Sequence, residues 1–322
     1  MKSLKAISLE SKIFLIILFI LLVLPPFTSM YQIRILSKFV LFAIFAMSLD
    51  LIWGYSGMVS FGHAAFFGLG AYSLTLLLVR FPEGGTLVAI AGSLLVPVVL
   101  ALFMSFFLIY GKVSGVYFAI ITLVVSLTLE LLCTAWYSLT KGLTGFTPIP
   151  PLSIFYLKFD ADTTARLVQY YYLIILVAAL IYFILHFFTR SRYGLLLQAI
   201  KDNPKRAQFL GHNIAGAKTI AFILAAAIAG LAGGLYAPLE DFISPQLLGL
   251  VYSTQVIIWV AVGGRNTLIG PFIGTIILVY LETIFSGIIV EAWYLIIGII
   301  LVVVVLFWPD GLMGIVSKRI RK

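Results

Sequence analysis

The residues that most often carry chemistry are few in this 322-residue chain, and they are scattered. Its three histidines are His63, His186 and His212, and none belongs to an H-E-x-x-H pattern or has a spaced carboxylate that would complete a zinc site. The one cysteine, Cys133, excludes a disulfide framework and a cysteine-ligated metal site. No G-x-x-x-x-G-K-[ST] phosphate-binding loop is present, since the nearest stretch, residues 141–147, fails the spacing. We therefore expect no catalytic site, no cofactor-binding site and no metal site in this chain.

Carboxylates inside apolar segments are the next candidates, because ion-coupled carriers depend on them. Asp50, Glu130 and Glu282 occupy such segments. A charge at the centre of a membrane helix costs roughly 2.5–3.5 kcal/mol, so each one needs a function or a partner. All three fall toward the ends of their segments, and the sequence shows no basic or acidic partner for a proton or sodium relay. We therefore favour carboxylates that are solvated or paired locally.

The composition around these residues is that of an integral membrane protein. Charged residues make up only 10% of the chain and hydrophobic residues 62%, whereas soluble domains carry about 25% charged residues. The mean hydropathy is +1.16. The formal charge of +9 does not indicate nucleic-acid binding, because the basic residues lie in short loops between apolar runs, as they do in membrane proteins.

The sequence predicts an all-α, polytopic membrane protein with about ten transmembrane helices, because a spanning helix needs about 20 mostly apolar residues. The first apolar run follows three lysines, as in a signal peptide, but lacks a convincing cleavage site and is interpreted as an uncleaved helix. The third span is rich in glycine and is predicted to be broken or partly re-entrant. The predicted spans are 13–30, 37–53, 58–79, 87–110, 113–136, 168–189, 219–237, 246–262, 268–286 and 292–308.

The basic residues also predict an orientation with both termini in the cytoplasm. With the N-terminus inside, fifteen Lys and Arg residues fall on the inner side and six on the outer side. Two long connections result, an outer loop over 137–167 and an inner loop over 190–218. The chain is expected to form a single transmembrane domain, 1–322.

The inner loop carries the signals of a short helix over 204–210. Asn203 is a good helix cap, and Pro204 suits the first helical position because its φ is fixed and it has no N–H. Gly211 occupies the position where a left-handed residue would end the helix. An isolated helix of two turns is unstable in water, so other contacts must hold it.

Two apolar residues on this helix, Phe209 and Leu210, would expose their surface to the cytosol unless a partner or the protein's own base covers them. The alternative is a juxtamembrane elbow whose basic residues meet anionic lipid headgroups. The residues alone do not separate these two interpretations.

Four stretches of the chain resemble a known family in order and spacing. They are residues 54–72, residues 192–213 with 221–237 after them, residues 263–275, and TrpProAspGlyLeuMetGly at 308–314. Over about residues 37–316 the chain resembles LivM-type permeases, the membrane subunits of branched-chain amino acid ABC importers. That family also contains permeases for urea and simple amides.

The resemblance implies a permease subunit in the cytoplasmic (inner) membrane of a bacterium or archaeon. The implied partners are a second, LivH-like permease subunit, two ATP-binding subunits of the LivG and LivF type that carry the ATP and Mg²⁺, and an extracytoplasmic substrate-binding protein. It also implies that the inner loop is a coupling loop, which docks into a groove on an ATPase and transmits its closure. The matching positions are Gly194, Ala199, Asp202, Asn203, Arg206 and Gly211, to which we add Phe209 and Leu210 as apolar contacts.

The glycine-rich segment has two interpretations, close helix packing or the lining of a solute route. Ser60, His63, Phe66 and Phe67 are the candidates for such a route, because they offer mixed polar and apolar contacts. Residues 263–266 predict a tight inner turn rather than a second ATPase contact. We expect selectivity to lie in the binding protein, because no cluster of charged residues that could hold both an ammonium and a carboxylate is visible in the sequence.

The function expected from this combination is ATP-driven alternating access for branched-chain or other hydrophobic amino acids. Three alternatives stay open: the same architecture carrying urea or short amides, a stand-alone secondary transporter or channel, and a membrane scaffold without cargo. Co-purification with ATPase subunits separates an ABC importer, whether for amino acids or for amides, from a stand-alone carrier.

Overall fold

The structure, a computed structural model, describes residues 2–81, 85–154, 157–159, 164–285, 295, 298–300, 302–303, 306 and 311–314. These residues are almost entirely helical, and the all-helical prediction is confirmed. The long helices are α1 (Lys2–Val23), α2 (Met30–Asp50), α3 (Ala64–Arg80), α4 (Thr86–Leu108), α5 (Val116–Ala135), α7 (Thr164–Arg190), α10 (Ile214–Glu240), α11 (Leu250–Gly263) and α12 (Ile269–Phe285). The short ones are η1 (Pro25–Phe27), η2 (Leu51–Tyr55), α6 (Tyr137–Thr140), η3 (Gly142–Thr144), α8 (Arg192–Asp202), α9 (Pro204–Phe209) and η4 (Pro245–Leu248).

Each of the first nine predicted spans overlaps one of these long helices, with boundaries that differ by up to eleven residues, while the tenth, 292–308, falls largely outside the described residues. Within the described part of the chain, five helical segments are long and apolar enough to cross a membrane. They are α2 continued through η2, α4, α5, α7 and α10, and α3, α11 and α12 are shorter apolar helices. The chain is thus a polytopic helical membrane protein.

The first helix ends earlier than predicted, at Val23 instead of residue 30. Pro25 and Pro26 follow one residue later, and because a proline has no N–H, neither can donate the backbone hydrogen bond that would continue the α-helix. The next helix then begins with a capping box, in which the Ser29 hydroxyl accepts from the Gln32 N–H and the Gln32 side chain accepts from the Ser29 N–H. This cap moves the start of α2 to Met30, seven residues before the predicted boundary.

The third predicted span, 58–79, is irregular only over its first six residues, and α3 is continuous from Ala64 to Arg80 through Gly68 and Gly70. A π-helical turn, η2, continues α2 to Tyr55, and regular helix resumes only at Ala64. The irregular stretch between them is covered by α5, because a Cβ added at Gly62 would overlap the carbonyl group of Thr122. Irregular backbone at membrane depth is tolerated where protein covers it.

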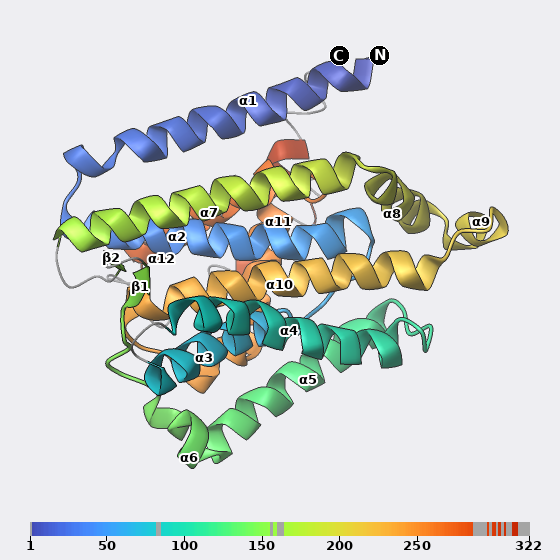
Figure 1. Ribbon diagram of the computed structural model, residues 1–322. Coiled ribbons are helices and arrows are strands. Elements are labelled where there is room, and N and C mark those ends of the chain that lie inside the picture. Colours follow the sequence, from blue (N-terminus) through green and yellow to red (C-terminus); the bar gives the residue numbers. More distant parts are fainter. Residues whose placement is uncertain are drawn as a thin grey trace.

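Helices α2 and α10 form the centre of the bundle, and α1, α4 and α5 lie toward its outside (Figure 1). α2 packs against α7, α10, α11 and α12, and α10 also packs against α3 and α4. The α3–α10 contact depends on glycine: a Cβ at Gly70 would overlap the carbonyl of Gly230, and one at Gly233 would overlap the carbonyl of Phe67. In α4 and α5 most residues are not buried, and their apolar side chains form the outer surface.

The bundle has two ends with different structures (Figure 1). Helices α8 and α9 lie at one end, together with the start of α1. At the opposite end lie α6 and a two-stranded antiparallel sheet, in which β1 (Leu152–Ile154) pairs with β2 (Leu157–Phe159). The segment before the sheet is fixed to the end of α10, since Phe146 forms a backbone bridge with Ile243 and the Ile149 N–H donates to the Asp241 carboxylate at 2.6 Å.

Candidate functional sites

The connection between α7 and α10 is a pair of helices, of which α8 is fixed to the bundle. Ser191 caps α8 by accepting from the N–H of Gly194. Gly194 lies so close to the end of α7 that a Cβ there would overlap the carbonyl of Thr189. Leu197 and Ile200 are buried on the face that packs against α7, α10 and η2. α8 therefore lies on the protein's own helices.

The predicted short helix is present as α9, Pro204–Phe209, one residue shorter than expected. The Asn203 side chain accepts from the N–H of Arg206 at 3.0 Å, and Gly211 has a φ of 83°, as the sequence predicted for the two ends of the helix. Ala207 is the residue that α9 buries, and α8 and α10 supply the contacts. These caps and contacts explain how a helix of only six residues is stable.

Two apolar side chains at the end of α9 are uncovered, next to the exposed polar residues Lys205, Arg206 and Gln208. The Phe209 side chain is 90% exposed and Leu210 is 72% exposed. Beside them runs a groove of about 570 Å³ between α8 and α9. Its lining includes five of the eight predicted coupling residues, namely Ala199, Asp202, Asn203, Arg206 and Leu210. Of the other three, Gly194 allows the close contact with α7, Gly211 has the positive φ that follows α9, and Phe209 is exposed and does not line the groove.

Helix α8 is connected to the last turns of α2 by polar contacts, which we call the α2 junction. The Lys201 ammonium donates to the carbonyl oxygen of Gly54 at 2.6 Å. Asp50, on the preceding turn, accepts from the N–H of Asn266 at 2.8 Å. The α2 junction thus joins the α8–α9 pair, the end of α2, and the turn between α11 and α12.

Two further contacts complete the α2 junction. The Arg265 guanidinium lies 5.0 Å from the centre of the Trp53 ring. A Cβ at Gly311 would overlap the Cα of Gly264, so the 311–314 segment packs directly on the turn. Residues 263–266 form the tight turn that the sequence predicted. All four stretches that carry the family resemblance therefore contribute to one cluster of contacts.

Asp50 is fully buried, which corrects the expectation that it could reach water. Its position at the end of α2 was predicted, but η2 extends the helix by another turn and α8 and the 264–267 turn cover it. One of its oxygens is bonded to Asn266, and the other has no hydrogen bond within the described residues. The alternative of local pairing is the one that the structure supports.

The predicted solute route is closed in this structure. Its four residues are fully buried between helices: Ser60, His63, Phe66 and Phe67. None of them lines the groove beside α9 or the larger cavity at the other end of the bundle. His63 Nε2 lies 2.8 Å from the Ser48 hydroxyl, and the imidazole stacks on the Phe45 ring with a centroid distance of 5.4 Å. In this conformation they contribute to the packing of α3 against α2 and α10.

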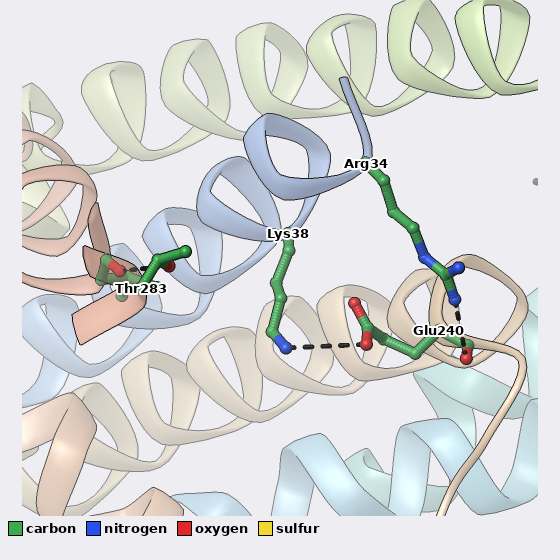
Figure 2. Close-up of polar contacts among 5 residues, drawn as sticks. Arg34, Lys38, Glu240 and Thr283 are labelled. Carbon is green, nitrogen blue, oxygen red and sulfur yellow. Dashed lines mark hydrogen bonds and ion pairs between the residues drawn. The ribbon is translucent and has the colours of Figure 1, made fainter. Parts of the chain in front are cut away.

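A larger cavity, of about 840 Å³, lies at the end opposite α8–α9; we call it the charged cavity. Its polar lining combines Arg34 and Lys38 of α2 with Glu130 of α5, Glu240 of α10, Gln255 of α11 and Glu282 of α12. Figure 2 shows Arg34 and Lys38 reaching from α2 to the end of α10, where the Lys38 ammonium lies 3.6 Å from the Glu240 carboxylate. Arg34 donates to the Glu240 carbonyl oxygen at 3.0 Å.

The expectation that the chain offers no cluster of charged residues is therefore wrong. Arg34 and Lys38 are four residues apart, so the sequence could have placed them on one face of a helix. The acidic residues come from three other helices, and Glu240 lies 202 positions after Lys38. No local pattern brings such residues together.

The structure combines a bundle of long apolar helices with a charged cavity at one end and an exposed capped helix at the other. A family described as "Branched-chain amino acid transport system / permease component" matches residues 31–305, and the chain belongs to this family. It is therefore a permease component of an ABC transporter, a multi-pass protein of the prokaryotic inner membrane, and is not itself catalytic. No cofactor is expected in this subunit.

Individual relatives are of two kinds. The chain is 25% identical to the high-affinity branched-chain amino acid permease protein LivM of Escherichia coli K12, over 98% of this chain and 77% of that protein. It is 24% identical to LivM of Salmonella typhimurium with the same coverage. It is also 24% identical to LivH of E. coli K12, over 85% of this chain and 91% of that protein. No solved structure matches the chain.

Proposed function

We propose that this chain is the LivM-like half of an ABC importer for branched-chain and other hydrophobic amino acids. In this proposal residues 1–322 form one permease domain with ten spans and cytoplasmic termini, an outer loop over 137–167 and a coupling loop over 190–218. The chain is similar to both LivM and LivH proteins, which supports pairing with a LivH-like subunit of similar fold around a shared pathway. LivG-like and LivF-like ATPases and an external binding protein complete the transporter.

One observation carries the coupling proposal: a capped helix, fixed to the bundle through α8, presents an almost fully exposed phenylalanine. An exposed aromatic beside a groove is typical of a surface that a partner protein covers. We assign the ATPase contact to Phe209 and Leu210 together with the groove residues Ala199, Asp202, Asn203 and Arg206. Gly194 and Gly211 set the backbone that positions them.

Movement of the docked ATPase would reach the membrane helices through the α2 junction. Lys201 joins α8 to Gly54, and Asp50 joins the same part of α2 to the α11–α12 turn. A displacement of α8 then moves α2 and α12 together. Ser60, His63, Phe66 and Phe67 meet solute, in this proposal, only in a state in which α3 has separated from α2 and α10.

The proposal is tested by co-expressing the chain with the ATPase and permease subunits of its transporter. The wild-type chain is expected to co-isolate with the ATPases in mild detergent and to support ATP-dependent leucine uptake in proteoliposomes with the binding protein. Phe209→Asp, or a Gly/Ser linker in place of residues 204–210, is expected to lose the ATPases. Uptake by the chain alone, indifferent to ATP, would show a secondary transporter instead.

A further inference from the structure

The charged cavity has the size and the lining of a solute site. Small-molecule sites are clefts of about 300–1,000 Å³ with apolar walls and a few placed polar groups, and this cavity measures about 840 Å³. Its apolar wall includes Phe42 and Tyr252, whose ring centres are 6.1 Å apart. Charges of both signs surround this wall, which is the requirement for holding a zwitterion.

Lys38 is the cation best placed to receive an anionic group. Its ammonium lies 3.6 Å from the Glu240 carboxylate, which is an ion pair but too long for the charge-assisted hydrogen bonds of about 2.7–2.9 Å. The ammonium also lies 5.8 Å from the centre of the Phe42 ring and 5.7 Å from that of the Tyr236 ring. No hydrogen bond from Lys38 is found among the described residues, and a carboxylate bound there would accept N–H groups that the rings and the 3.6 Å ion pair leave without a hydrogen bond. The Arg34 guanidinium, by contrast, already donates to a backbone carbonyl.

Glu130 is the matching anion. Its carboxylate lies against Gly249, where a Cβ would overlap it, so the glycine gives this side chain room at the cavity wall. Within the described part of the chain its carboxylate oxygens have no hydrogen-bond partner, whereas Glu282 accepts from the Gln255 amide at 3.2 Å. Lys38 and Glu130 come from different helices, α2 and α5, and line one cavity.

We propose that the charged cavity is a transit site for a zwitterionic α-amino acid with an apolar side chain, in which Lys38 binds the carboxylate, Glu130 binds the ammonium group, and Phe42 and Tyr252 contact the side chain. This inference rests on the proposed function and deepens it. A neutral amide or urea can hydrogen-bond to Lys38 and Glu130 but forms no ion pair with either, so the site favours a zwitterionic amino acid. Its position at the end opposite the coupling loop is where solute would enter from the binding protein.

The experiment uses the complete transporter in proteoliposomes, with ATP inside and leucine-loaded binding protein outside. Initial leucine uptake, ATP hydrolysis and the yield of assembled complex are measured for Lys38→Met, Glu130→Gln and the double variant Lys38→Met/Glu240→Gln. Arg80→Met is the matched control, because Arg80 is an exposed cation at the end of α3 that does not line the cavity.

Lys38→Met and Glu130→Gln are each expected to lower leucine uptake about tenfold or more, because each variant loses one hydrogen bond to a charged group of the solute. The yield of assembled complex and the rate of ATP hydrolysis are expected to stay within about twofold of the wild-type values. Arg80→Met is expected to leave all three measurements unchanged. The double variant separates binding from structure: if Lys38 only neutralises Glu240, removing both charges restores uptake, and the inference is overturned. If Lys38 binds solute, uptake stays low.

Two failures are distinguishable. Full leucine uptake by the single variants overturns the transit site and leaves the proposed function intact. A wild-type transporter that carries urea or a short amide but no leucine overturns the proposed function, and this inference with it.

Discussion

Replacing Phe209 with alanine measures how much binding energy the exposed tip of α9 contributes. The side chain is 90% exposed, so nearly its whole apolar surface is available to a partner. Full burial of such a side chain is worth about 1.5–3 kcal/mol, which corresponds to a loss of affinity of about tenfold to 150-fold. The folded permease loses no internal contact of note, so its thermal stability is expected to change little.

Phe27→Ala is the matched control for this variant. Phe27 is 81% exposed and lies in η1, which follows the end of α1, whereas the start of α1 lies at the α8–α9 end of the bundle. The affinity of the purified ATPase subunits for detergent-solubilised permease is measured by titration for both variants. We expect a loss of at least tenfold for Phe209→Ala and a change within twofold for Phe27→Ala. A Phe209→Ala permease that binds the ATPases with wild-type affinity, or an equal loss for both variants, would refute the docking argument.

Three further predictions concern what holds the coupling loop and the bundle. Asn203→Ala removes the cap of the six-residue α9 at a cost of about 1 kcal/mol and is expected to lower solute uptake per ATP hydrolysed. Asn213→Ala is the control, because it removes the equivalent cap from the long, packed α10 and is expected to change that ratio little. Lys201→Met breaks the hydrogen bond to the Gly54 carbonyl and removes a positive charge near the buried Asp50 carboxylate, so we expect ATP hydrolysis to continue while solute uptake falls. Uptake that keeps pace with hydrolysis would argue against transmission of the ATPase movement through the α2 junction. Gly70→Ala drives a methyl group into α10 and is expected to lower the thermal midpoint of the solubilised protein, at a cost of about 1–3 kcal/mol. Gly298→Ala is expected to leave the midpoint unchanged, because an added Cβ there meets none of the described residues within 4 Å; equal midpoints for the two variants would contradict the close α3–α10 packing.

Local features of the fold were predictable from the sequence because their causes are local. Asn203, Pro204 and Gly211 fix α9 through backbone preferences that act within one or two turns. The same reasoning missed the capping box at Ser29, although the serine and glutamine that form it are only three residues apart.

The sites depend on contacts that no local pattern encodes. The buried Asp50 carboxylate accepts a hydrogen bond from Asn266, which lies 216 positions later in the chain. The hydrophobic pattern of the sequence showed only that Asp50 lies near a helix end. Lys38 and Glu240, which form an ion pair in the charged cavity, are likewise 202 positions apart in the sequence. The family resemblance identified which segments carry the function, but the way those segments meet at the α2 junction became visible only in three dimensions.

The central claim, that α9 is the surface on which the ATPase docks, is tested most directly by photo-crosslinking in the assembled transporter. A benzoylphenylalanine at position 209 keeps an aromatic side chain in place, and the same probe at position 27 is the control. We expect irradiation to produce an adduct between permease and ATPase for position 209 and none for position 27. An assembled transporter that transports solute but gives no ATPase adduct from position 209 would contradict the account.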